Sequence, residues 1–174
     1  MVLVSSPIEQ FKSHKKQILN SVKKTLDSGQ YILGKNVADF EKNFANFIGV
    51  KYAIGVANGT DGLELALRSL GVGYGDEVIT VSHTAMATVS AIESIGAKPV
   101  FVDIENDYFC INTKDIEKNI SKKTKAIICV HLYGQPANLK ELKRISKRNS
   151  IHLIEDVSQA HGSKYGKKKL GSIG

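Results

Sequence analysis

The 174-residue sequence has no tryptophan and only two cysteines. Cys110 and Cys129 fall on unrelated predicted elements and form no CxxC pair, which favours a reducing compartment such as the cytoplasm. No apolar run approaches the ~20 residues that a membrane-spanning helix needs. The N-terminus also lacks the basic region and long apolar core of a signal peptide. We therefore expect a cytoplasmic protein without a membrane segment.

The histidines lack metal-ligand spacings such as HxxxH, so no metal site is expected. The formal net charge of +7 raises the question of nucleic-acid binding. The lysines, however, lie in small clusters without interleaved aromatic residues on which bases could stack. We expect no nucleic-acid partner, and a solvated basic surface that helps to attract an anionic substrate.

Strand and helix patterns alternate along most of the chain. Apolar positions at helical spacing predict helices over 8–28, 37–48, 60–70, 84–95, 113–120 and 139–148. Apolar runs predict strands over 52–56, 77–81, 99–104, 126–132 and 151–157, and a hairpin over 163–170. This order predicts an α/β fold, a mostly parallel sheet flanked by helices on both faces. Such sheets bind ligands outside the carboxyl ends of their strands.

Gly59 and Thr60 follow the first predicted strand and open a helix. Glycine allows a ligand to approach the backbone closely, and the first N–H groups of a helix attract anions such as phosphate. The alternative is that Asn58 and Gly59 form only a turn and Thr60 is an N-cap. A dinucleotide-binding fingerprint is disfavoured, because Ala57 stands where GxGxxG requires glycine.

Asp156 ends an apolar strand and is therefore directed at the ligand-binding edge of the predicted sheet. A carboxylate there can hold a pyridine nitrogen protonated, which makes the ring an electron sink. Gln159, three residues later, is within reach of the phenolic oxygen of such a ring. The alternatives are that Glu155 or Asp156 caps the next turn, or that the pair performs acid–base chemistry. His83 follows another strand, where its ring could stack on a cofactor, and residues 131–134 are expected mainly to shape the backbone.

Together, these residues resemble the DegT-type (StrS-type) sugar aminotransferases, which have the aspartate aminotransferase fold (type I). The resemblance extends over almost the whole chain in matching segments: GQYILG (29–34), FEKNFA (40–45), ANGTD (57–61), HTAMAT (83–88), VHLYGQ (130–135), EDVSQAHG (155–162) and LGSIG (170–174).

The resemblance implies a pyridoxal 5'-phosphate enzyme that transfers an amino group, usually from glutamate, to a nucleotide-linked keto-sugar. It implies a homodimer whose active site is shared between the subunits. By the same resemblance Gly59, Thr60 and Asp61 match the phosphate-binding helix start. Asp156 matches the residue that faces the pyridinium nitrogen, and Gln159 the one near the phenolic oxygen.

The sequence departs from this family at two places. Ala85 stands where relatives often carry an aromatic residue that stacks on the ring, and His83 is predicted to take that role. The Schiff-base lysine of the family is expected beyond Gly174, and Lys164 and Lys167–Lys169 belong to the predicted hairpin. No catalytic residue is therefore assigned within this chain.

The expected organisation is an N-terminal helical arm (1–34) and a partial cofactor-binding large domain (35–174), without the small C-terminal domain. We accordingly expect an inactive fragment of an aminotransferase. Three alternatives stay open: a non-catalytic remnant that docks on a full-length homologue, a nucleotide-binding α/β module, and a relative of the sugar dehydratases that carry histidine in place of the lysine.

Overall fold

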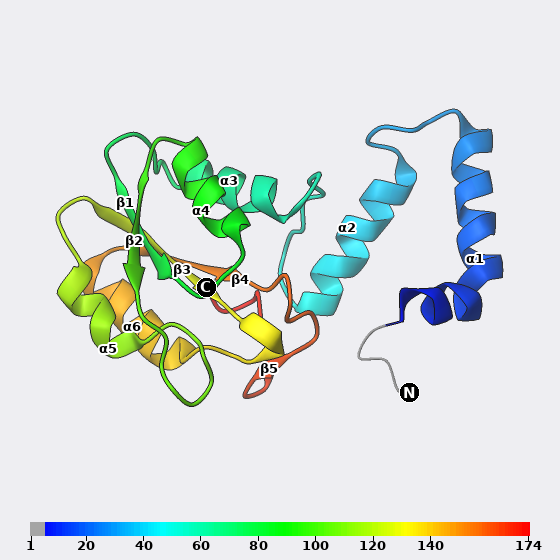
Figure 1. Ribbon diagram of the computed structural model, residues 1–174. Coiled ribbons are helices and arrows are strands. Elements are labelled where there is room, and N and C mark those ends of the chain that lie inside the picture. The colour runs from blue at the N-terminus through cyan, green and yellow to red at the C-terminus, as the bar shows by residue number, and fades with distance from the viewer. Residues whose placement is uncertain (1–5) are drawn as a thin grey trace. The chain divides into compact units, whose positions relative to one another are not determined.

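A computed structural model describes residues 6–174 of the chain (Figure 1). Contacts divide the chain into two compact units, Met1–Phe44 and Ala45–Gly174. The division falls after Phe44, inside the second helix, whereas the sequence placed the end of the helical arm after residue 34. The domain boundary therefore stays a prediction.

The first unit contains α1 (Pro7–Ser28) and most of α2 (Lys35–Ile48). Pro7 occupies the first turn of α1, and Gly29 ends the helix with a left-handed φ of 67°, as the sequence predicts. No residue of α1 between Pro7 and Ser28 is buried, although apolar side chains recur along it. Leu19 and Leu26, for example, are 51% and 60% exposed.

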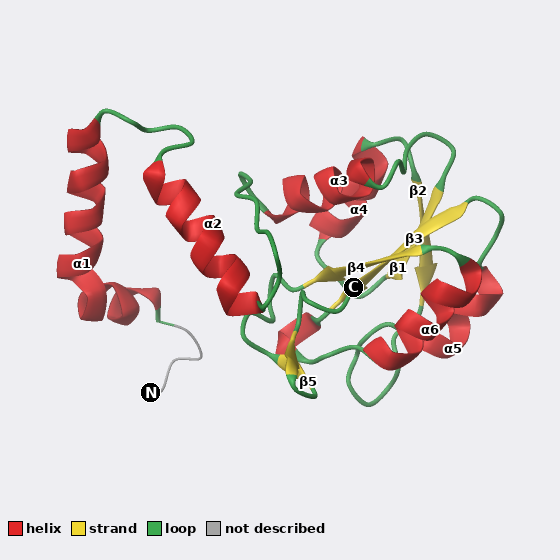
Figure 2. Ribbon diagram, turned by 180° about the vertical axis from the view of Figure 1, so that it is seen from behind, coloured by secondary structure: helices red, strands yellow, loops and turns green. Residues whose placement is uncertain are grey.

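The second unit is built on four parallel strands in the order β2-β1-β3-β4. Their bounds are Glu77–Val81 (β1), Lys98–Val102 (β2), Thr124–Val130 (β3) and His152–Asp156 (β4). Helices α3 and α4 cover one face of the sheet, and α5, η1 and α6 cover the other (Figures 1 and 2). The predicted α/β fold is confirmed.

The helices of this unit have the bounds Gly59–Ser69 (α3), Met86–Ser94 (α4), Thr113–Ile116 (α5), Glu117–Asn119 (η1), Leu132–Gly134 (η2) and Leu139–Asn149 (α6). The predicted hairpin is also present, as β5 (Lys164–Tyr165) paired antiparallel with β6 (Lys168–Lys169).

Strand β3 lies in the middle of the core, and every residue from Ala126 to Val130 is buried. Parallel strands covered on both faces read as continuous apolar runs, which is why this strand was the clearest in the sequence. Thr80 of β1 is the polar exception beside it. Its hydroxyl is buried and donates to the carbonyl oxygen of Ile128 at 3.1 Å, so the buried polar group keeps a partner.

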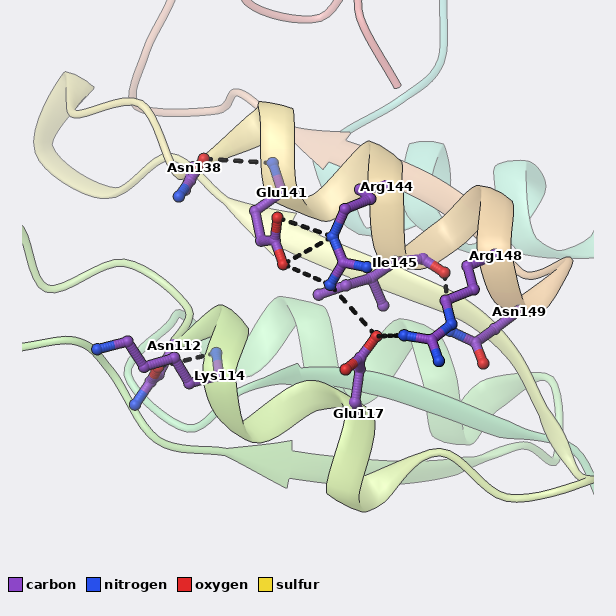
Figure 3. Close-up of polar contacts among 9 residues, drawn as sticks. All are labelled: Asn112, Lys114, Glu117, Asn138, Glu141, Arg144, Ile145, Arg148 and Asn149. Atoms are coloured by element: carbon purple, nitrogen blue, oxygen red, sulfur yellow. Dashed lines mark hydrogen bonds and ion pairs between the residues drawn. The ribbon is translucent and has the colours of Figure 1, made fainter.

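Asparagine side chains cap three helices of this unit. Asn58, Asn112 and Asn138 each accept a hydrogen bond from a backbone N–H in the first turn of α3, α5 and α6. Figure 3 shows the last two. A reciprocal capping box at α6 would also require the Glu141 side chain to accept from the Asn138 backbone N–H. The Glu141 carboxylate instead pairs with Arg144.

A cluster of charged side chains joins η1 to α6 on the outer face of the helical layer. Glu117 accepts from Arg144 and from Arg148, each at 3.4 Å, as Figure 3 shows. These side chains are 40–67% exposed, so solvent screens each pair and its contribution to stability is small. The cluster is a solvated surface feature.

The predicted strand over 52–56 is wrong. These residues pair with no strand in the described part of the chain, and Tyr52 and Ile54 are 71% and 80% exposed. The segment is apolar, but a strand also requires a hydrogen-bonded neighbour. The four-stranded sheet does not include residues 52–56.

Both cysteines are expected to resist thiol reagents in the native protein. Burial, followed by the charge of Glu105, raises the pKa of the Cys110 thiol to about 11, and burial raises the pKa of Cys129 well above its usual value. Since the thiolate is the reactive form, maleimide labelling at pH 7 should be slow for both thiols and fast in denaturant. Rapid labelling of either cysteine without denaturant would contradict the buried positions described here.

Candidate functional site

The sheet has its topological switch point between β1 and β3. The chain leaves β1 through α4 on one face to reach β2, and then returns through α5 and η1 on the other face to β3. In open α/β sheets a crevice forms at the carboxyl ends of the two strands where the winding reverses. A cavity of about 220 Å³ lies there. Its lining comes from the start of α3 and from the segments that follow β1, β3 and β4: Gly59, Thr60, Leu63, Thr84, Ala85, Ala87, Val130, Leu132, Asp156, Ser158 and Gln159.

The start of α3 presents free backbone donors to this cavity. Asn58 accepts the N–H of Asp61 with its side chain at 2.9 Å and the N–H of Gly62 with its carbonyl at 3.1 Å. The N–H groups of Gly59 and Thr60 have no acceptor within residues 6–174, as expected for the first residues of a helix. The N-cap is therefore Asn58, and the alternative that Thr60 caps the helix is wrong.

Gly59 lies close to Ser158, which also lines the cavity. A Cβ built at this position would lie 3.3 Å from the Oγ of Ser158, which is tighter than an ordinary contact. The backbone here is thus open to a ligand because the residue is glycine. Free N–H donors, the positive end of the α3 dipole and this open backbone together fit a phosphate group.

Asp156, at the end of β4, faces the same cavity and is half-buried. Its Oδ1 accepts from the N–H of Ser158 at 3.0 Å and from the Ser158 hydroxyl at 2.7 Å. This is the turn-capping arrangement that the sequence left open as an alternative. Oδ2 accepts no hydrogen bond from the residues that the structure describes, so one carboxylate oxygen is available to a protonated nitrogen.

Gln159 lines the cavity with one end of its amide already engaged. Its Oε1 accepts from the backbone N–H of Tyr133 at 3.0 Å. An N–H donor requires the oxygen at that end, so the Nε2 group is the end that remains to donate. A donor suits a phenolate oxygen, which accepts hydrogen bonds.

Asp61 and His83 do not line the cavity. The backbone N–H of Asp61 is taken by Asn58. The His83 ring is exposed and lies 6.1 Å from the Tyr133 ring, centroid to centroid, with its Nε2 3.5 Å from the Tyr133 hydroxyl. The structure thus brings together Gly59, Thr60, Asp156 and Gln159, while the cofactor-binding roles of Asp61 and His83 stay predictions.

The sequence did not single out Ser158, and it assigned Tyr133, within residues 131–134, only a role in shaping the backbone. Ser158 lies between Asp156 and Gln159, and its hydroxyl links the Asp156 carboxylate to the neighbourhood of Gly59. Tyr133 has a left-handed φ of 58°, which is rare for a residue other than glycine and marks positions held in place by their surroundings. The available signal was their position just after apolar strands.

A larger cavity, of about 770 Å³, lies among the segments 104–114 and 135–138 and Tyr165. It contains none of the residues predicted to bind a ligand. We place the candidate site in the smaller cavity because it brings the free N–H groups at the start of α3 together with an available Asp156 oxygen and with Gln159. No lysine is among the residues lining that smaller cavity.

Within residues 6–174 no helix is both long and apolar enough to cross a bilayer. The same residues contain no group of three or more histidine, cysteine or acidic side chains placed to hold a metal ion.

Comparison with known proteins identifies the family. The DegT/DnrJ/EryC1/StrS aminotransferase family matches residues 12–174. The chain is 45% identical over 161 residues to a dTDP-3-amino-3,6-dideoxy-alpha-D-galactopyranose transaminase of Aneurinibacillus thermoaerophilus, a match that covers 92% of this chain and 44% of the relative.

Two solved structures share the fold. The crystal structure of S. venezuelae DesV in complex with a ketimine intermediate aligns with a TM-score of 0.93 at 38% identity, covering 94% of this chain and 44% of that one. The ntda structure from Bacillus subtilis with bound cofactor PMP aligns with a TM-score of 0.84 at 34% identity, covering 86% and 34%. The chain therefore spans less than half the length of these relatives, which are aminotransferases of fold type I. On these matches, the chain belongs to the DegT/DnrJ/EryC1/StrS aminotransferase family.

Proposed function

We propose that this chain forms the cofactor-binding part of a pyridoxal-phosphate-dependent aminotransferase that aminates a nucleotide-linked keto-sugar, with glutamate as the amino donor. The observation that carries the proposal is the cavity at the switch point. It is lined by two free helix N–H groups and by Asp156, which has an available carboxylate oxygen. A phosphate and a protonated ring nitrogen are the two ends of pyridoxal phosphate.

At the phosphate end, the N–H groups of Gly59 and Thr60 donate to the phosphate oxygens and the Thr60 hydroxyl adds a third donor. The dipole of α3 favours the negative charge. Because Gly59 has no side chain, the phosphate can approach the backbone closely. Asp61 is proposed to belong to the same helix start without contacting the cavity itself.

At the ring end, Asp156 keeps the pyridine nitrogen protonated through Oδ2, while Ser158 fixes the carboxylate through Oδ1. When bound, pyridoxal phosphate supplies the electron sink that amino transfer requires. The Nε2 of Gln159 donates to the phenolic oxygen. His83 is proposed to approach one face of the ring, where Ala85 offers no aromatic group.

The substrate and the assembly are inferred from the family and from the surface of the chain. The relative from Aneurinibacillus thermoaerophilus is named for a dTDP-linked amino sugar. A net charge of +7 favours such anionic substrates by electrostatic attraction.

The exposed apolar side chains of α1 support association with a second copy as a homodimer. Residues 1–34 are proposed to be the arm and 35–174 part of the large domain.

The residues that line the cavity bind and orient the cofactor but include no lysine. We therefore propose that the 174-residue polypeptide binds pyridoxal phosphate without catalysing amino transfer by itself. Binding, rather than turnover, is the property to measure.

Replacing Gly59 with valine is expected to weaken pyridoxal phosphate binding at least tenfold. The new side chain fills the space beside Ser158 and keeps the phosphate from the N–H groups, which costs at least one hydrogen bond to a charged group. Equilibrium dialysis with pyridoxal phosphate measures the effect. Gly62→Ala in the same helix is the matched control, because its Cβ meets only Val56 at an ordinary 3.6 Å. Equal affinities of the two variants would contradict a phosphate site at the start of α3.

A further inference from the structure

Glu155 carries a buried carboxylate that the proposed function does not use. Its side chain is only 3% exposed, although it lies next to Asp156 at the end of β4. Oε2 accepts from the His131 ring at 3.1 Å and from the N–H of Gly171 at 3.0 Å. Oε1 accepts from the N–H groups of Ile173 at 2.7 Å and Gly174 at 2.6 Å.

Four donors saturate this carboxylate, which has about four lone-pair sites. Burial alone would raise the pKa of the Glu155 carboxyl, but the hydrogen bonds from His131 and from the three backbone N–H groups hold that pKa below its usual range. Glu155 is therefore ionised and fully occupied. It has no free lone pair with which to take a proton from a substrate, so the acid–base role that the sequence left open for it is disfavoured.

His131 is completely buried, and the structure defines which ring nitrogen carries its proton. Nδ1 accepts from the backbone N–H of Ala137 at 3.0 Å, so the ring proton is on Nε2 and is donated to Glu155. The backbone N–H of His131 also donates to the carbonyl of Asp156 at 3.0 Å. The ring of His131 thus closes the loop 131–137, and its ring and backbone N–H together connect this loop to the end of β4.

The loop closed by His131 reaches the candidate site through Tyr133. Tyr133 and Gly134 are both left-handed, with φ values of 58° and 82°. A left-handed tyrosine costs free energy and persists only where its surroundings enforce it. Its N–H donates to Oε1 of Gln159, which decides which end of the Gln159 amide faces the cavity.

The same carboxylate holds the segment 171–174 against the outer edge of the sheet. Strand β4 is an edge strand in the order β2-β1-β3-β4. A Cβ at Gly174 would lie 3.0 Å from the carbonyl oxygen of Leu153, so the backbone of the segment lies close to that strand. Glu155 is the junction between this segment and the 131–137 loop.

We propose that Glu155 and His131 are a buried positioning pair. The pair fixes the 131–137 loop, and through the Tyr133 N–H it orients Gln159 so that the Nε2 group of Gln159 faces the cofactor site. The identity of the ligand rests on the proposed function, whereas the arrangement of the pair does not.

Glu155→Gln tests the pair with little change in size. A glutamine amide keeps one oxygen. The N–H groups of Ile173 and Gly174 can only donate, so the oxygen stays with them and the N–H₂ faces His131, the partner whose ring can become an acceptor. The His131 proton then moves to Nδ1, and Ala137 loses its acceptor. In ¹⁵N NMR spectra the wild type should show His131 protonated on Nε2, and the variant should lose that signature. Amide exchange at Tyr133 should become at least tenfold faster. The affinity for pyridoxal phosphate should fall about tenfold, the effect of losing one hydrogen bond to the ligand.

A purely structural role would accelerate exchange throughout the sheet, whereas a positioning role changes the loop and the ligand affinity. Glu141→Gln on α6 is the matched control, because Glu141 pairs only with exposed Arg144, and it should change none of these readouts. Unchanged Tyr133 exchange in folded Glu155→Gln, or a wild-type His131 protonated on Nδ1, would overturn the proposal.

Two His131 variants decide the matter if Glu155→Gln does not fold. Asparagine can accept from Ala137 but cannot reach Glu155, so His131→Asn should keep the loop protected and expose the amides of 171–174. Glutamine can donate to Glu155 from the position of Nε2, so His131→Gln should keep the amides of 171–174 protected and expose those of the 131–137 loop. The same pattern in both variants would overturn the pair. If the wild type binds no pyridoxal phosphate, the proposed function fails, while the His131 tautomer and Tyr133 exchange still decide the positioning pair.

Discussion

Replacing Asp156 with asparagine is expected to weaken pyridoxal phosphate binding about 10- to 100-fold. Hydrogen bonds to a charged group contribute about 1.5–3 kcal/mol, and a ring N–H that faces an amide N–H₂ loses its acceptor. Asparagine keeps the shape of the side chain and an oxygen for the N–H and hydroxyl of Ser158, so the turn after β4 should persist. Equilibrium dialysis of both proteins with pyridoxal phosphate gives the ratio of affinities.

Two controls isolate the ring nitrogen as the cause. Asp103→Asn makes the same change in the loop that follows β2, where the carboxylate accepts only the N–H of Ile104 at 2.8 Å and lies outside the cavity. Its affinity should match the wild type. A pyridoxal phosphate analogue with carbon in place of the ring nitrogen should bind wild type and Asp156→Asn equally. A large difference with that analogue would show that Asp156 acts on something other than the nitrogen.

Much of the fold was predictable because buried parallel strands and capped helices leave strong local patterns. The continuous apolar run of β3 and the helical spacing of α6 are examples that the structure confirms. The segment 52–56 has the same apolar character and is not a strand, because pairing depends on neighbours that no local pattern records. Helix α4 likewise begins at Met86 rather than Thr84, because Ala85 has an extended backbone and is the N-cap.

The ligand-facing residues of the candidate site were predictable from the sequence, but the contacts that hold them in place were not. Gly59 and Asp156 stand next to predicted element ends, so the rule that ligands bind at the carboxyl edge was enough to find them. The Tyr133–Gln159 bond and the His131–Glu155 pair join residues 26 and 24 positions apart. These contacts appear only once β3 and β4 lie side by side. Sequence periodicity carries no information about such contacts.

Leu67→Ala in α3 is expected to lower the free energy of unfolding of the second unit by about 2–5 kcal/mol. Leu67 is completely buried in the core between α3 and the sheet, so the substitution removes buried surface and leaves a cavity. Leu65 provides a matched control on the same helix, since it is 53% exposed. Leu65→Ala should change the free energy of unfolding by no more than about 0.5 kcal/mol. Urea unfolding followed by circular dichroism measures both.

Comparing these two variants also separates effects on folding stability from effects on ligand binding. Both make the same change in helix propensity, so their difference reports burial alone. A ligand that binds only the folded state stabilises every variant by an amount set by its concentration and affinity. With the phosphate held at the N-terminus of α3 as proposed, saturating pyridoxal phosphate should raise the urea midpoint of both leucine variants equally, and should raise that of Gly59→Val much less. A Leu67→Ala protein that is destabilised but no longer stabilised by the cofactor would show that the α3 N-terminus depends on the core beneath it.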